Sequence, residues 1–280
     1  MKRKLLWATM FMILISASGQ ICAAGVGILN GLTHARSVEA GTTYEGIIVL
    51  NNMGDSAEEV RLYQTDYRFL YDGKKFYDDP GQNLRTNAPW ITYSPERLRI
   101  PAQGQIEVKY QVSVPGDPTL LGSYWSVIMI EVIPPVNAAP SSKSTDQISF
   151  GIAQVFRYAV QIVTHIGNSG ERNIKFLNIK MEDTENKRSL HVDVENTGER
   201  WLRPYLTIEI YDEDGNPAGV FEGGRWRIYP GTSVRYSVDL TGMTEGKYSA
   251  LILVDNKDDN VFGAQYSLEI KSRVRVRSDK

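Results

Sequence analysis

The chain alternates apolar and polar residues with a period of two through almost its whole length, and this pattern limits it to β-structure. One example is the run Ile106, Val108, Tyr110, Val112 and Val114, in which every intervening residue is polar. Beyond an apolar run near the amino terminus, no window of about 12 residues keeps the apolar stripe of a helix. We therefore expect an all-β protein built from half-buried strands.

Turn sequences rich in Gly, Pro, Asn and Asp separate these strands at short intervals. About seven strands fit into residues 25–166, as in an immunoglobulin-like β-sandwich. A second set fits into residues 172–272, and the polar, glycine-containing segment 165–171 joins the two sets. The sequence predicts two immunoglobulin-like β-sandwich domains in tandem, residues 25–166 and 172–272, followed by a basic tail, residues 273–280.

Residues 1–24 have the pattern of a secretory signal peptide. Lys2, Arg3 and Lys4 precede an apolar run that is shorter than the ~20 residues of a spanning helix. Ala23 and Ala24 are the small residues expected before a cleavage site. We expect cleavage after Ala24 and export to the periplasm, with no membrane span left in the mature chain. An uncleaved membrane anchor is the alternative.

The charge and the cysteine content limit which partners the protein can bind and how its fold can be stabilised. Without the signal, 28 Lys and Arg residues stand against 33 Asp and Glu, a net charge of −5. A general nucleic-acid binder needs a basic excess, so we expect no nucleic-acid partner. The single cysteine, Cys22, lies in the signal, and the mature protein must therefore be stabilised by its core without disulfides.

The sequence contains no pattern typical of catalysis or of a metal site. His34, His165 and His191 each lack a second ligand at metal-site spacing, and no nucleophile elbow, phosphate loop or dinucleotide fingerprint is present. The segment from Asp212 to Asn216 resembles the start of a calcium loop, but no glutamate closes it. We expect no enzyme activity, no cofactor and no bound metal.

The longest strand candidate covers residues 148–164, about three times a typical strand length. Ile148, Phe150 and Ile152 begin an apolar series of one parity that continues to Ile162. Such a strand can complete its own sandwich with one half and present an exposed edge with the other. The Pro-, Ala- and Ser-rich segment 134–147 precedes it and is expected to be a loop.

The end of the chain alternates positive and uncharged residues. Lys271, Arg273, Arg275 and Arg277 would share one face of an extended chain. Contact with an anionic polymer or a lipid headgroup is one interpretation. A solvated, frayed end is the other.

Several segments, taken in order, resemble the amino-terminal domain of the periplasmic pilus-assembly chaperones, the PapD-like family. In that family an arginine on the first strand lies sixteen positions before an asparagine that ends the second, as Arg36 does before Asn52. Residues 90–101 (WITYSPERLRIP) resemble the segment leading to the family's fifth strand, and residues 122–135 (GSYWSVIMIEVIPP) resemble the sixth. The resemblance covers about residues 35–166, whereas the second domain resembles the family only in size and strand content.

The resemblance implies a chaperone that lends an edge strand to a subunit of a pilus or fimbria and thereby caps it. Ile148, Phe150 and Ile152 would be the lent residues. The family holds the subunit's terminal carboxylate with two basic residues in the cleft between the domains, and Arg36 matches the first. The family's second basic residue is a lysine, and this sequence has Gln154 at that position. Arg157 is a substitute candidate, although it matches better an arginine that braces the two domains.

Two functions therefore stay open. The first is a periplasmic assembly chaperone that binds and caps protein subunits of a surface structure. The alternative is a structural immunoglobulin-like binding module of the cell envelope that holds a protein or glycan partner. In that alternative, Ile148, Phe150 and Ile152 complete their own core and Arg36 is a surface charge. An exposed edge favours the chaperone, and a covered edge favours the structural module.

Overall fold

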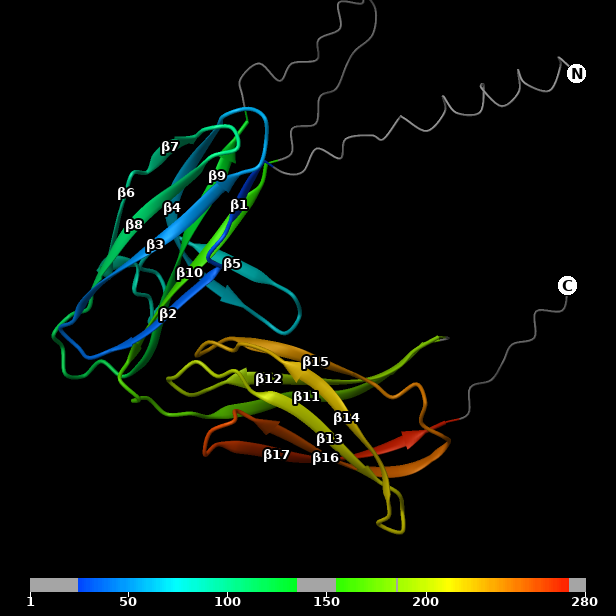
Figure 1. Ribbon diagram of the computed structural model, residues 1–280. Coiled ribbons are helices and arrows are strands. Elements are labelled where there is room, and N and C mark those ends of the chain that lie inside the picture. Colours follow the sequence, from blue (N-terminus) through cyan, green and yellow to red (C-terminus); the bar gives the residue numbers. More distant parts are fainter. Residues whose placement is uncertain (1–24, 135–154, 185, 272–280) are drawn as a thin grey trace, which may run out of the picture.

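The computed structural model describes residues 25–134, 155–184 and 186–271, and these form two β-sandwiches arranged like the arms of a boomerang (Figure 1). The prediction of an all-β protein with two immunoglobulin-like sandwiches is confirmed. Within the described residues the only helix is a short 3-10 turn, η1 (Ala88–Trp90).

The first sandwich consists of two sheets. One has the strand order β1-β3-β8-β6, and the other has the order β2-β10-β9-β4-β5, with β7 paired to β4. The strands are β1 (Val26–Ile28), β2 (Thr33–Val38), β3 (Thr43–Asn52), β4 (Glu58–Phe69), β5 (Lys75–Asp78), β6 (Ile91–Ser94), β7 (Arg97–Ile100), β8 (Gln105–Ser113), β9 (Gly122–Ile133) and β10 (Arg157–Ile166).

Burial along the strands follows the apolar alternation of the sequence. In β8 the apolar residues Val108, Tyr110 and Val112 are buried and the polar residues between them are exposed, because one face packs on the core and the other meets solvent. Most of β9 is buried on both faces. Its sequence is correspondingly a nearly continuous apolar run, and on its second face Ser123 and Trp125 contact the other sandwich.

The first strand of the sandwich is split between the two sheets. β1 pairs antiparallel with β3, and the chain then bends at Gly31 (φ +85°) and crosses to the other sheet. There β2 pairs parallel with β10. This crossing matters for function because β2 covers only part of the β10 edge.

The second sandwich also has two sheets, with the orders β11-β12-β15 and β14-β13-β16-β17. Its core is separate from that of the first sandwich. The strands are β11 (Ile174–Asp183), β12 (Arg188–Asn196), β13 (Tyr205–Tyr211), β14 (Pro217–Arg225), β15 (Ser233–Asp239), β16 (Gly246–Asp255) and β17 (Val261–Ile270).

Both sandwiches use a buried asparagine to hold the turn after an early strand. The Asn52 amide donates to Ser56 O (2.7 Å) and its Oδ1 accepts from Gly54 N–H (2.9 Å). Asn196 does the same with Arg200 O (2.8 Å) and Gly198 N–H (2.9 Å). Asn52 therefore has a structural role at the end of β3.

One strand of the second sandwich ends where its sequence does not become less apolar or aromatic. β14 ends at Arg225, although Trp226, Ile228 and Tyr229 follow directly. The register of its pairing shifts beside Gly224, which has a φ of +80°, and the chain leaves the sheet. Ile228 then forms an isolated bridge with Leu202, and Tyr229 is thereby placed at the contact between the sandwiches.

Candidate functional site

The two halves of β10 have different neighbours. Residues 161–166 lie between β2 and β9, whereas residues 157–160 pair with β9 alone. Gln161 donates its N–H to Leu32 O (2.9 Å), on the β2 side. Because strand residues alternate in direction, the N–H and C=O of Ala159 point to that same side, where no described strand meets them. This half of β10 is an open sheet edge that can accept an extended chain.

The side chains of β10 alternate between the core and the outside. Tyr158, Val160 and Ile162 face the core of the first sandwich, as the parity of the sequence predicts. Just before the strand, Val155 and Phe156 are 42% and 39% exposed. The open edge is therefore continued by apolar residues that their own sandwich leaves uncovered.

At its other end β10 joins an aromatic cluster between the two sandwiches. Trp125 of β9 stacks on Tyr229 of the second sandwich, with ring centroids 4.6 Å apart and an interplanar angle of 10°. Val163 is buried with them, and Phe69 and Trp201 pack against the cluster. Stacked, fully buried rings of this kind hold the two sandwiches together.

Hydrogen bonds from the second sandwich cross the same contact to β2 and β10. Arg227 Nη1 donates to Thr33 Oγ1 (2.7 Å) and to Gln161 Oε1 (3.1 Å). The hydroxyl of Tyr229 donates to Gln161 Oε1 (2.5 Å). The Arg227 guanidinium lies 4.7 Å from the ring centre of Trp201. Gln161 therefore accepts two bonds that fix the second sandwich against the β10 face.

The backbones at the junction approach so closely that only glycine fits. A Cβ on Gly122 would lie 2.2 Å from Glu199 O, and one on Gly170 would lie 2.4 Å from Gly122 Cα. Both glycines have positive φ, +77° and +88°. The segment predicted as a linker is thus packed against both sandwiches.

A buried histidine completes the junction. Ser123 Oγ accepts from Trp201 N–H (2.8 Å) and lies 2.8 Å from His165 Nδ1. Burial, and then the nearby Arg200, lower the pKa of His165 to about 4. Arg200 donates to the carbonyls of Gly167 (3.0 Å) and Ser169 (3.1 Å). His165 is therefore neutral at pH 7, and its Nδ1 shares a hydrogen bond with the Ser123 hydroxyl.

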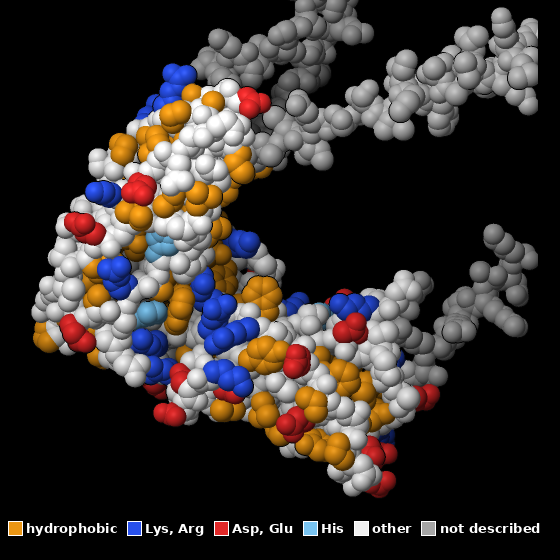
Figure 2. Space-filling model, in the orientation of Figure 1, with side chains coloured by type: hydrophobic (Ala, Val, Ile, Leu, Met, Phe, Trp, Pro, Cys, Tyr) orange, Lys and Arg blue, Asp and Glu red, His pale blue; other side chains and the backbone are white. Residues whose placement is uncertain are grey.

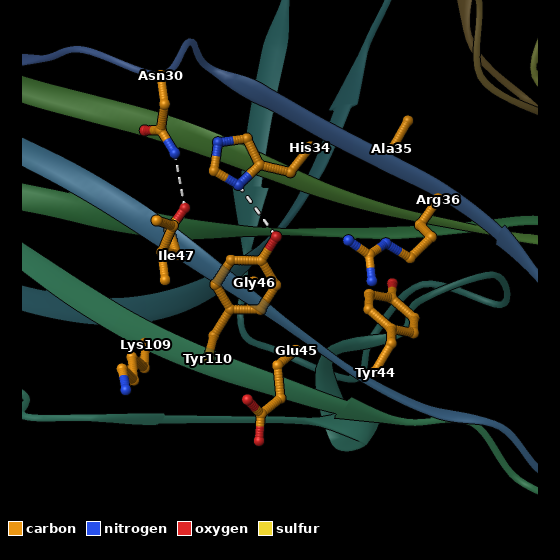
Figure 3. Close-up of a pocket in the computed structure, with 10 residues that line it drawn as sticks. All are labelled: Asn30, His34, Ala35, Arg36, Tyr44, Glu45, Gly46, Ile47, Lys109 and Tyr110. Atoms are coloured by element: carbon orange, nitrogen blue, oxygen red, sulfur yellow. Dashed lines mark hydrogen bonds between the residues drawn. The ribbon is translucent and has the colours of Figure 1, made fainter.

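Arg36 lines a pocket of about 530 Å³ between β2 and β3 (Figure 3). Its guanidinium lies 5.2 Å from the ring centre of Tyr44. His34 Nδ1 lies 3.0 Å from the hydroxyl of Tyr110. Burial raises the pKa of Tyr110 to about 12. Lys109 lies on the rim of the same pocket.

The register of β2 shows which way Arg36 faces. Arg36 is opposite Thr164, and His34 is opposite Ile162, a core residue. Residues that lie opposite each other on neighbouring strands have their side chains on the same face of the sheet. Thr33 and Gln161 share the other face, which contacts the second sandwich. Arg36 therefore lies on the side of the sheet away from the cleft between the domains.

The structure does not bring the predicted anchors Arg36 and Arg157 together. Arg157 begins β10 and donates from Nε to Glu131 (2.6 Å). Seven positions separate it from Thr164, the register partner of Arg36. At about 3.3 Å per residue, that is over 20 Å along the strand. Arg157 also lies at the end of β10 away from the second sandwich. The arginines that bond across the junction include Arg85, which pairs with Glu199 (2.9 Å), and Arg227.

The other predicted site residues lie outside the described part of the chain. These are Ile148, Phe150, Ile152 and Gln154, together with the signal peptide and the basic tail after Lys271. Their assigned roles stay predictions.

Sequence reasoning missed Gln161, Arg227 and Tyr229, which meet at the junction. Gln161 does carry a signal in the sequence, since it is a polar residue in the run Val160, Gln161, Ile162, Val163. Nothing local marks Arg227, because its partners are 66 and 194 positions away.

In the described ranges, no group of three or more His, Cys, Asp or Glu side chains could hold a metal ion. The same ranges contain no helix long and apolar enough to cross a membrane.

Known structures with a similar fold include fimbrial chaperones, whereas no family model and no curated protein matches the chain. A structure from a chaperone–tip adhesin complex of CFA/I fimbriae is 11% identical, covers 87% of this chain and 98% of its own, and has a TM-score of 0.46. The class 5 fimbriae chaperone CfaA is 12% identical, with coverage of 88% and 100% and a TM-score of 0.44. The Pseudomonas aeruginosa chaperone CupB2 is 13% identical, covers 85% of this chain and 98% of its own, and has a TM-score of 0.41. The chain is similar to these chaperones in its overall fold, at low sequence identity.

Proposed function

We propose that this chain is an exported assembly chaperone, which binds a protein subunit of a fimbria-type surface structure in the periplasm and caps it with the β10 edge. The open half of β10 is the observation that carries the proposal. The backbone groups of Ala159 point outward with no described strand opposite them. An added strand would gain main-chain hydrogen bonds there. The function is binding, without catalysis.

The lent side chains are the apolar series that precedes β10. Ile148, Phe150 and Ile152 have the same parity as Tyr158 and Val160. If the strand continues without a bulge, they extend the same face beyond the sandwich's own core. A lent side chain seated in a partner's pocket contributes about 1.5–3 kcal/mol through burial.

Arg36 is the proposed carboxylate anchor, and its place is the pocket between β2 and β3. Neither it nor Lys109 forms an ion pair with any described carboxylate. Arg157 is less suited to this role because it already pairs with Glu131, a carboxylate that also pairs with Arg61. Gln154 in place of a lysine leaves Arg36 without the second basic residue of the usual grip.

Proline substitutions at neighbouring positions of β10 test the edge. Ala159→Pro removes an N–H that points to the open side, so the fold should persist and capture of the partner from a periplasmic extract should fall at least tenfold. Val160→Pro is the matched control, because its N–H belongs to the ladder with β9 and its loss should lower the melting temperature. Unchanged capture by a folded Ala159→Pro protein would contradict the proposal.

A second pair of variants separates the chaperone from the structural module. Ile152→Asp should abolish capture and leave the melting temperature unchanged, since a carboxylate in a partner's apolar pocket is strongly disfavoured. Arg36→Ala should weaken capture by about 2 kcal/mol or more if it holds a carboxylate. If Ile152→Asp unfolds the chain and Arg36→Ala binds normally, the structural module is the better account.

A further inference from the structure

A second pocket, of about 430 Å³, lies between the β4–β5 hairpin and the second sandwich. Positive charge and aromatic rings dominate its lining, and neither Asp nor Glu contributes to it. Its charged and aromatic members are Tyr67, Phe69, Tyr71, Lys74, Lys75, Trp226, Arg227, Tyr229 and Arg235. In Figure 2, Lys and Arg side chains gather where the two arms meet, next to hydrophobic side chains. The pocket therefore favours a ligand with negative charge and apolar groups.

Two of its four cations have no carboxylate partner among the described residues. Arg235 is neutralised by Asp193 (2.6 Å), and Lys74 by Asp72 (2.7 Å). Lys75 forms no such pair, and Arg227 binds only the neutral Thr33 and Gln161. The Nε of Arg227 is buried without a partner. A partly desolvated guanidinium without a counter-charge is costly, and an incoming anion would offset that cost.

Exposed aromatic rings concentrate around the same pocket. Four aromatic side chains in the described residues are both large and exposed, and Phe156 is the only one of them beside β10. The other three are Tyr71 (37%), Tyr77 (47%) and Trp226 (52%). Tyr77 stacks on Tyr67, a lining residue, with centroids 5.1 Å apart. Exposed tyrosine and tryptophan beside cations are typical of binding surfaces.

The strand β5 supplies a free edge beside this pocket. It is the last strand of its sheet. Leu70 N–H donates to Lys74 O (3.0 Å), so the backbone of Lys74 faces β4. In an antiparallel pair every second residue faces the neighbouring strand, and Phe76 and Asp78 therefore face β4 as well. Lys75 and Tyr77 lie between those residues, and their N–H and C=O groups point away from β4. The same two residues carry a free cation and an exposed ring.

We propose that an extended acidic segment of a protein partner docks along β5. Its backbone pairs with Lys75 and Tyr77, its apolar side chains pack on Tyr77, Tyr67 and Trp226, and its carboxylates face Lys75 and Arg227. This edge is separate from the open half of β10, because β9 and β4 lie between β10 and β5 in the sheet. The protein then has two docking edges on one sheet, and the β5 edge is selective for acidic sequences.

Titration calorimetry with blocked peptides tests this edge. We expect a peptide of alternating valine and glutamate to bind the purified exported protein, and the corresponding valine–lysine peptide to bind at least tenfold more weakly. Lys75→Glu should reverse that preference. Lys247→Glu, at an exposed lysine of β16 in the second sandwich, is the matched control and should leave it unchanged. Ala159→Pro should also leave it unchanged, so failure at β10 and failure at β5 are distinguishable.

Three outcomes would overturn the inference. One is equal affinity for the two peptides, and another is an equal effect of Lys75→Glu and Lys247→Glu. The third is competition by free glutamate at the affinity of the peptide, which would show a site for small anions and not for a strand.

Discussion

The two ends of β10 belong to one strand but differ in how many strands they pair with and in how deeply they are buried. At the junction end β10 has a strand on each side, and buried rings and a bifurcated acceptor, Gln161, tie its outer face to the second sandwich. At the outer end it has one neighbouring strand and two exposed apolar residues, Val155 and Phe156. Disruption of the first end should therefore lower stability, whereas disruption of the second should change binding.

The largest effect is expected from Trp125→Ala. Trp125 is 2% exposed and stacks on Tyr229, so its loss leaves a cavity between the sandwiches and should cost about 3–5 kcal/mol of unfolding free energy. Denaturant unfolding measures the cost. Trp226→Ala, at a site 52% exposed, is the control and should cost under about 1 kcal/mol. Equal costs would mean that the junction does not carry the stability assigned to it.

Acidification should weaken the junction through His165. The unfolded imidazole takes a proton near pH 6.5, whereas the folded one does so only near pH 4. The unfolded state therefore binds more protons in this interval, and stability falls as the pH drops from 6.5 towards 4. The contribution amounts to about 3 kcal/mol.

The measurement for His165 is urea unfolding at pH 7, 5.5 and 4 for the wild type and for His165→Gln. The variant should show the smaller loss, because glutamine cannot take up the proton. Parallel losses in the two proteins would assign the acid sensitivity to other groups.

A smaller effect is expected from Gly122→Ala. A non-glycine residue at a positive φ costs about 1–2 kcal/mol, and here the added Cβ would also meet Glu199 O at 2.2 Å. Gly215→Ala is the matched control, since Gly215 has a similar φ of +82° with open space around its Cβ position. Thermal unfolding should show the larger loss for Gly122→Ala. Equal losses of stability would indicate that the backbone near Glu199 shifts to make room for the added Cβ.

The fold can be predicted from the sequence because period-two alternation can be recognised within a single short segment of the chain. The alternation in β8 and the continuous apolar run of β9 each specify a strand and its burial. The family resemblance, and not the alternation, places Arg36 on an early strand and Asn52 at the end of the next, where the structure has them. The face of β2 on which Arg36 lies is not local information. It depends on the register with β10, more than 120 positions away, and a shift of one residue would reverse it.

The junction could not be predicted for a related reason. Gln161 gains its role from Arg227 and Tyr229, and Gly122 from Glu199, and these contacts form only when two separately folded cores meet. The open half of β10, in contrast, lies within the long strand candidate 148–164, of which the structure shows a strand from Arg157 onward.

Amide hydrogen exchange at Ala159 and Val160, measured with and without the captured subunit, tests the central claim most directly. In the free protein we predict fast exchange at Ala159, whose N–H faces the open side, and slow exchange at Val160, whose N–H bonds to β9. Binding of the subunit should slow Ala159 and leave Val160 unchanged. An Ala159 amide that exchanges slowly in the free protein, or stays fast in the complex, would contradict strand donation by β10.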